Sequence, residues 1–203
     1  MTELWQGEFG DAYTRRHSNA STNPHQRQQL WEWLLSLSCE SVLEVGANAG
    51  LNLEAIARIR PCEIYACEPN DLARNELLSL ELTPSSFITA DYADKLSFPN
   101  HVAEVSITCG VLIHIPPDKL LQSMREIYRC TKHTIICAEY FAPSEEMIPY
   151  RGHDNALWRR DYGSLWLDNF TDLHCTTCAF AWRRLTGLDN LTIWVLERGP
   201  RRH

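Results

Sequence analysis

One segment of the sequence combines residue types that suit a ligand with a phosphate- or ribose-like part. The run from Glu44 to Gly50 places Gly46 and Gly50 on either side of Asn48. Glycines at such a spacing let the backbone turn tightly and approach a ligand beside a helix N-terminus. Asn48 stands where a glycine is usual, but asparagine tolerates the left-handed conformation better than most residues. The loop alone is a weak signal, because tight turns between a strand and a helix are common.

Two acidic residues follow at the ends of later apolar runs. Glu68 lies about 20 residues beyond Gly46, which is the distance at which an acid accepts hydrogen bonds from ribose hydroxyls. Asp91 is followed by Tyr92, and this pair suits the exocyclic amine and the ring face of an adenine. Each acid alone fits an ordinary surface loop equally well. Three such elements in order favour a bound nucleoside.

The elements that must position these residues alternate between strand and helix. Strands are predicted at 41–45, 63–67, 86–89, 104–108 and 134–138, and helices at 51–60, 71–80, 118–130 and 157–170. This alternation predicts a parallel sheet with helices on both faces. Two further apolar runs, 177–182 and 191–197, are joined by a turn in which no helix is expected, so they predict an antiparallel hairpin.

The first 38 residues predict a helical cap. Trp5, Phe9 and Tyr13 recur every four positions, which places them on one face of a helix. That face is either a packing surface or a lid over the ligand. Asn23-Pro24 resembles the start of a second helix. The apolar face of this second helix is expected to carry Leu30, Trp33, Leu34 and Leu37.

Length and composition favour a single domain. The 203 residues are 44% apolar and 22% charged, which suits one ordinary core. We expect a cap at 1–38, a Rossmann-like core at 39–197 and a basic tail at 198–203. The net charge of −7 argues against a nucleic-acid partner, and no apolar run approaches the length of a membrane span.

The eight cysteines are scattered, and no signal peptide is visible. We therefore expect reduced thiols and a cytoplasmic location. Cys175 and Cys178 have the spacing of half a zinc site, but no second pair follows them. Because structural zinc usually takes four ligands, no metal is expected.

These motifs together resemble the class I S-adenosylmethionine-dependent methyltransferases, over residues 23 to the C-terminus. The resemblance implies an α/β fold with a mostly parallel seven-stranded sheet that ends in an antiparallel hairpin. It also implies that the glycine loop holds the methionine part of S-adenosylmethionine, while the two acids hold its ribose and adenine. The implied cofactor-binding residues are Tyr13, Glu44, Gly46, Asn48, Gly50, Glu68, Asp91, Tyr92 and Cys109.

Three further runs, 7–13, 110–115 and 148–154, resemble a group of methyltransferases associated with pseudaminic acid biosynthesis. Pseudaminic acid is a nonulosonic sugar acid with amino, hydroxyl and carboxylate groups. The resemblance therefore implies a small-molecule acceptor that is methylated on oxygen or nitrogen, and it leaves the atom and the oligomeric state open.

The remaining candidate residues follow the fourth and fifth strands. His114 and His153 are the candidate bases, with His114 alternatively a buried, hydrogen-bonded histidine. Tyr150 and Arg151 are the candidate substrate-binding residues, since arginine can hold a carboxylate through two hydrogen bonds. Their loop could instead be merely solvated.

Other functions compete with a small-molecule methyltransferase. A nicotinamide-dependent oxidoreductase shares the glycine loop and the ribose acid, but it explains neither Asp91 nor the terminal hairpin. A non-enzymatic cofactor-binding or scaffold protein, and a methyltransferase that acts on protein or nucleic acid, also remain as alternatives.

Overall fold

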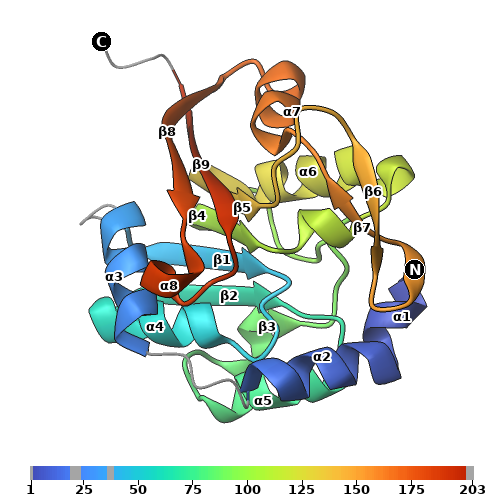
Figure 1. Ribbon diagram of the computed structural model, residues 1–203. Coiled ribbons are helices and arrows are strands. Elements are labelled where there is room, and N and C mark those ends of the chain that lie inside the picture. Colours follow the sequence, from blue (N-terminus) through green and yellow to red (C-terminus); the bar gives the residue numbers. More distant parts are fainter. Residues whose placement is uncertain (1, 19–23, 36–38, 200–203) are drawn as a thin grey trace.

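The computed structural model describes residues 2–18, 24–35 and 39–199 (Figure 1). Asn23 and Leu37, which belong to the predicted cap, lie outside these ranges, as do residues 200–203 of the predicted tail. None of the helices in these ranges combines the length and the apolar character that crossing a bilayer requires.

A seven-stranded sheet forms the centre of the molecule, in the order β3-β2-β1-β4-β5-β9-β8. Its strands are β1 (Ser41–Val45), β2 (Glu63–Cys67), β3 (Ile88–Thr89), β4 (Ala103–Cys109), β5 (Thr131–Glu139), β8 (Leu173–Ala181) and β9 (Leu191–Arg198). The first five are parallel, β9 is antiparallel to β5, and β8 is antiparallel to β9. The predicted α/β fold with its terminal antiparallel pair is confirmed.

Helices cover both faces of this sheet (Figure 1). They are α3 (Pro24–Leu34), α4 (Leu51–Ile59) and α5 (Asp71–Ser79) on one face, and α6 (Pro117–Cys130) and α7 (Tyr162–Asn169) on the other. Alternate residues of a strand point to opposite faces, so Val42 packs with α3 and α4 whereas Leu43 and Val45 pack with α6 and α7. β1 thus contributes to both apolar cores.

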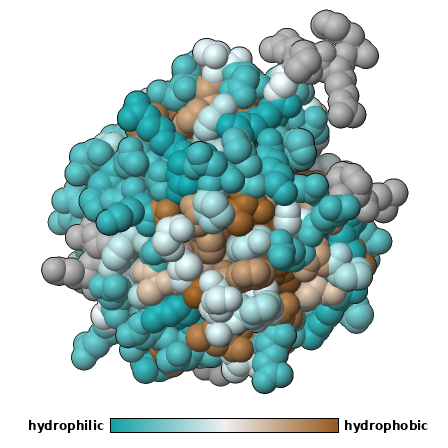
Figure 2. Space-filling view, turned by 180° about the vertical axis from the view of Figure 1, so that it is seen from behind, coloured by the Kyte–Doolittle hydropathy of each residue, from teal (hydrophilic) through white to brown (hydrophobic). Residues whose placement is uncertain are grey.

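Two smaller units lie beside the sheet. The helices α1 (Thr2–Gln6) and α2 (Glu8–Ser18) form one, and β6 (Glu146–Tyr150) pairs with β7 (His153–Arg159) in a separate two-stranded sheet. Figure 1 shows the tip of this hairpin next to α1. Seen from behind, polar side chains cover most of the molecule and apolar residues gather near the centre of the view (Figure 2).

The helix predicted over 157–170 is wrong at its start. Leu157 and Trp158 belong to β7, where they pair with Ile148 and Met147, and the helix begins only at Tyr162. The supposed loop at 150–154 is instead the tip of this hairpin. Arg151 and Gly152 both have positive φ, as a two-residue hairpin turn requires. The sequence did not predict β7 because the first half of this strand is polar and lacks the apolar alternation of a half-buried strand.

Two other differences concern the ends of elements. The last hairpin begins at Leu173 rather than residue 177, and its connection contains a short helix, α8 (Arg183–Thr186), where none was expected. The first half of the strand predicted at 86–89 belongs to a 3-10 turn, η1 (Ser85–Phe87), so that β3 keeps only two residues.

The apolar face of α3 also differs from the prediction. Trp31 is fully buried and donates from Nε1 to Asn52 Oδ1 over 3.2 Å. Trp33, which was placed on the buried face, is 59% exposed. The buried face is therefore formed by Leu30, Trp31 and Leu35, with Leu34 at its margin.

This pair of tryptophans provides a matched stability test. Trp31→Ala leaves a large cavity and removes the hydrogen bond from the indole to Asn52, so it should lower the free energy of unfolding by about 3–5 kcal/mol. Trp33→Ala, two positions away in the same helix, should change it by only about 0.5 kcal/mol. Urea unfolding followed by circular dichroism measures both, and equal losses would contradict the assignment of the buried face.

Candidate active site

A cavity of about 760 Å³ lies at the carboxyl ends of β1, β2 and β4. The sheet order reverses between β1 and β4, and open α/β sheets bind ligands at such a switch point. Every site residue predicted from the sequence lines this cavity except Gly50 and His153. The structure therefore brings together residues that are up to about 140 positions apart in the chain.

The glycine loop between β1 and α4 has the conformation that its residue types allow. Gly46, Asn48 and Gly50 all have positive φ, at 71°, 48° and 80°. A Cβ on Gly46 would stand 2.6 Å from Val111 Cγ2, and one on Gly50 would stand 2.4 Å from Leu77 Cδ1. Gly46 thus lets the loop approach the end of β4. Gly50 instead allows α5 to pack against the start of α4.

Glu68 is fixed in place by the backbone on both sides of it. Its Oε2 accepts from the N–H of Asn48 and its Oε1 from the N–H of Asn70, each over 2.8 Å. The side chain is only 8% exposed, and burial raises its pKa against the opposing effect of these two bonds and of Arg74. Each oxygen keeps a lone pair with which it can accept a further hydrogen bond.

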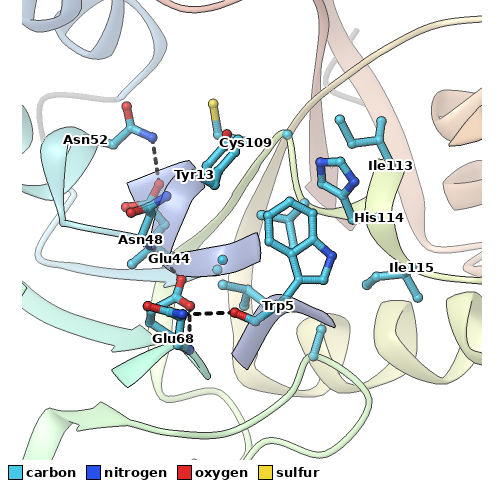
Figure 3. Close-up of a pocket in the computed structure, with 18 of the residues that line it drawn as sticks. Trp5, Tyr13, Glu44, Asn48, Asn52, Glu68, Cys109, Ile113, His114 and Ile115 are labelled. Carbon is cyan, nitrogen blue, oxygen red and sulfur yellow. Dashed lines mark hydrogen bonds between the residues drawn. The ribbon is translucent and has the colours of Figure 1, made fainter. Parts of the chain in front are cut away.

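Glu44 lies deeper and is held on one side only (Figure 3). Its Oε1 accepts from Asn52 Nδ2 over 2.6 Å, while Oε2 is buried and has no hydrogen-bond partner among the described residues. Arg27 donates to the Oδ1 of the same asparagine over 2.6 Å. Burial raises the pKa of Glu44 to about 8. A buried carboxylate oxygen without a donor fits a cationic ligand group.

Asp91, Tyr92 and Cys109 complete the wall on this side. Asp91 Oδ2 accepts from both the N–H and the hydroxyl of Ser97, over 2.8 and 2.6 Å, so this acid is oriented by its own loop. Burial raises the pKa of the Cys109 thiol to about 12, which keeps it neutral. Cys109 therefore offers a small uncharged surface rather than a nucleophile.

His114 ends a 3-10 turn, η2 (Leu112–His114), on the opposite side of the cavity (Figure 3). Its Nδ1 lies 2.7 Å from the carbonyl oxygen of Ala156. Because a carbonyl only accepts, Nδ1 carries the proton and Nε2 is left as an acceptor. Burial lowers the pKa of His114 to about 4, so the imidazole is neutral near pH 7. The ring lies 4.3 Å from that of Trp5 and 5.4 Å from that of Tyr150.

Two buried charged residues hold the turn that carries His114. Glu139, at the end of β5, accepts from the N–H groups of residues 111, 112 and 113 over 3.1–3.3 Å. Arg160 donates to the carbonyl of Ile115 over 3.1 Å and to Glu145 Oε2 over 2.7 Å. Both side chains are at most 2% exposed. The turn is thus fastened through its N–H groups to the sheet and through its carbonyls to the hairpin.

The hairpin brings the other predicted substrate residues to different places. Tyr150 and Arg151 line the cavity, and the guanidinium lies 5.5 Å from the centre of the tyrosine ring. His153 is exposed, lies outside the cavity lining, and packs edge-on against Phe9 at 5.1 Å. The two histidines therefore do not face one space.

Residues 43–137 match the family model of a methyltransferase domain. This stretch contains the glycine loop, Glu68, Asp91 and the turn that carries His114. This match and the fold together make the chain an S-adenosylmethionine-dependent methyltransferase. No curated protein matches the sequence.

Solved structures share the fold of this methyltransferase at low sequence identity. Magnesium protoporphyrin IX methyltransferase from Synechocystis PCC 6803, with bound S-adenosylmethionine, is 15% identical, with a TM-score of 0.71 over 98% of this chain and 95% of that one. The 1,6-didemethyltoxoflavin-N1-methyltransferase of Burkholderia thailandensis is 13% identical, with a TM-score of 0.73 over 98% and 88%. Both likenesses extend beyond the matched domain to nearly the whole chain.

Asn70 joins the two N-terminal helices of the methyltransferase to the side of the cavity that carries Glu68. Its Nδ2 donates to the carbonyl of Trp5 over 3.0 Å and to Asp11 Oδ1 over 2.9 Å, while its Oδ1 caps α5 at Ala73. Its N–H is one of the two that hold Glu68. Figure 3 shows the indole of Trp5 between the acidic side of the cavity and His114. One buried side chain thus links Glu68 to the two N-terminal helices.

Sequence reasoning missed several of these residues. Glu139 carries the same signal as Glu68, an acid that ends an apolar strand, and this signal could have revealed it. Asn70 stands before an acidic helix start, which is typical of an N-cap. Arg160 and Asn52 carry no local signal, because only the folded chain brings them to their partners.

Asn70→Ala tests the link to the covering helices. The change removes the α5 cap and both bonds to the N-terminal helices, so we expect a loss of about 1–2 kcal/mol in unfolding free energy and faster amide exchange over residues 8–18. Asn169→Ala, which removes an exposed bond to Leu165 at the end of α7, is the control. Unchanged exchange over 8–18 in the Asn70 variant would show that the cover is held elsewhere.

Proposed function

We propose that this methyltransferase methylates a small polar acceptor that carries an anionic group, such as a nonulosonic sugar acid, on oxygen or nitrogen. The observation that carries the proposal is that a neutral histidine, His114, and a cation, Arg151, line the same cavity. The structural neighbours named above also act on small molecules, magnesium protoporphyrin IX and 1,6-didemethyltoxoflavin. The sugar-acid class is supported by the three resembling runs in the sequence.

The cofactor side of the cavity fits S-adenosylmethionine, which supplies a methyl group on a cationic sulfur. We propose that the unpaired Oε2 of Glu44 accepts from the α-ammonium group, and that Glu68 accepts from the ribose hydroxyls. We propose that Asp91 and Tyr92, which line the same cavity, contact the adenine amine and ring. Gly46 and Asn48 supply the close backbone approach. Tyr13 and Cys109 complete the walls.

On the acceptor side, the protein's task is to position a nucleophile in line with the methyl group. His114 Nε2 would accept a hydrogen bond from the attacking hydroxyl or amine and take its proton, as the methyl carbon gains its bond to the acceptor and loses its bond to the cofactor sulfur, which leaves as a neutral thioether. The low pKa keeps the imidazole able to accept down to about pH 5. The low pKa also makes His114 a weak base, so that orienting the nucleophile is a large part of its role.

Arg151 supplies a local positive charge that can attract an anionic substrate, which the net charge of the protein cannot do. With a net charge of −7, the overall field does not attract an anion. The guanidinium stands at the hairpin tip, in a left-handed backbone conformation with φ of 50°. Such a conformation is uncommon outside glycine and asparagine and is often found at ligand-binding sites. We propose that it directs Arg151 to the carboxylate of the acceptor.

We propose that the N-terminal helices act as a lid. Trp5 and Tyr13 line the cavity from these helices, and Trp5 contacts Tyr13 and His114 at ring distances of 5.3 and 4.3 Å. A cover of this kind excludes water from a reactive sulfonium.

Cofactor binding should release a proton from Glu44. Its pKa of about 8 in the free protein leaves it mostly protonated at pH 7, and an adjacent ammonium favours the carboxylate and lowers that pKa. Binding should therefore release up to about one proton per site at pH 7 and almost none above pH 9. Calorimetry of S-adenosylhomocysteine binding in two buffers of different ionisation enthalpy measures this release.

Two variants make the assignment specific. Glu44→Gln should abolish the release of the proton, whereas Glu104→Gln should retain it. Glu104 accepts a hydrogen bond from the N–H of Glu40 at the amino end of β4, which is the end of the sheet away from the cavity. A binding enthalpy that is independent of the buffer in the wild-type protein would contradict the role of Glu44.

The acceptor side is tested by steady-state methyl transfer to nonulosonic sugar acids, with mass detection of the added methyl group. Arg151→Ala should raise KM roughly 10–100-fold through loss of a charge-assisted pair and leave cofactor affinity unchanged. His114→Ala should lower kcat, more for a hydroxyl acceptor than for an amine. His153→Ala should have a much smaller effect, since His153 lies outside the cavity lining. Wild-type kinetics in the first two variants would remove this side of the cavity as the acceptor site.

A further inference from the structure

A second cavity, of about 560 Å³, adjoins the first on the side of β9. It is lined by Tyr140, Phe141, Arg159, Phe180, Arg183, Asp189, Asn190 and Thr192. Three of these residues, Tyr140, Arg183 and Asp189, also line the first cavity. Tyr140 donates its hydroxyl to Asp189 Oδ2 over 3.1 Å. The two cavities therefore share one wall, which this hydrogen bond holds together.

The charge of the second cavity is unusual for an acidic protein. The side chain of Arg159 is exposed and forms no ion pair or hydrogen bond with any residue in the described ranges. Its strand neighbour Glu146 lies directly opposite in the β6–β7 pair, yet the two side chains form no ion pair within 4 Å. Arg183 is 74% exposed and reaches Asp189 only at 3.9 Å. One cation is thus without a partner and a second is weakly paired.

Two aromatic rings accompany these cations. Phe141 is 48% exposed and Phe180 is 64% exposed. Phe180 is the cross-strand partner of Thr192 in the β8–β9 pair, so both side chains line the cavity from the same face of the sheet. Exposed rings beside an unpaired guanidinium offer contact area for a planar group together with a charge for an anion.

We propose that the second cavity binds an anionic group borne on a planar part of the methyl acceptor, remote from the atom that is methylated. This inference rests on the proposed function, because it assumes that the acceptor occupies the first cavity beside Arg151. Arg159 and Arg183 hold the anion, which is a carboxylate or a phosphate ester, and the two phenylalanines hold the planar part. The acceptor is then longer than a single ring and lies across the wall formed by Tyr140 and Asp189.

The test uses phenyl phosphate, benzoate and inorganic phosphate as probes, titrated calorimetrically into the full chain saturated with S-adenosylhomocysteine. We expect phenyl phosphate or benzoate to bind more tightly than inorganic phosphate, because only they carry a ring. A preference between the first two identifies the anion as phosphate ester or carboxylate. Arg159→Ala should weaken binding of the preferred probe about tenfold or more, and Phe180→Ala should remove its advantage over inorganic phosphate.

Arg125→Ala is the matched control, since Arg125 is an exposed arginine on α6 that lines neither cavity. Equal losses in the Arg125 and Arg159 variants, or binding that is lost in Arg151→Ala but kept in Arg159→Ala, would overturn the proposal. So would the absence of measurable binding of either ring-bearing probe to the wild-type protein. Affinity for S-adenosylhomocysteine, measured in the same variants, should stay unchanged, which separates this outcome from a failure of the cofactor site.

Discussion

The carboxylate of Glu139 accepts hydrogen bonds from three successive backbone N–H groups at residues 111–113. The position of His114 depends on this arrangement, because those residues lead directly into it. Burial raises the pKa of Glu139 to about 7, so the N–H groups only partly offset the cost of its desolvation. Arg160 fastens the carbonyl side of the same turn. This short irregular segment is therefore held through both its N–H groups and its carbonyls.

Buried glutamates recur along the carboxyl edge of the sheet. Glu44, Glu68 and Glu139 end or follow three different parallel strands, and all three are at most 8% exposed. Desolvation raises the pKa of each. Two of them are bonded by backbone N–H groups on both oxygens, while Glu44 keeps one oxygen without a donor. The protein thus builds the polarity of the site before a ligand arrives, which avoids reorganisation during the reaction.

The sequence predicted the sheet well, and it identified the glycine loop and the acids that line the cavity, because all of these depend on local patterns. Apolar runs of strand length, a turn rich in positive-φ residues and acids at strand ends are visible without the fold. The hairpin that carries Tyr150 and Arg151 was missed, since half of β7 is exposed and polar. The face of α3 was misjudged because Trp31 and Trp33 are equally apolar, and only the position of Asn52 distinguishes them. Arg160 is brought to its partners solely by tertiary structure.

The strands β6 and β7 pair with each other in a sheet of their own. Their outer end can therefore change without disturbing the hydrogen bonds of the seven-stranded sheet. Because side chains alternate along a strand, adding one residue to each strand would extend the hairpin and turn the new tip toward the opposite face. The residues at the tip, Arg151 and Gly152, can thus be replaced without altering the central sheet. Relatives that inherit this core with a hairpin of another length would present a different side chain to the cavity and leave the glycine loop on the other side unchanged.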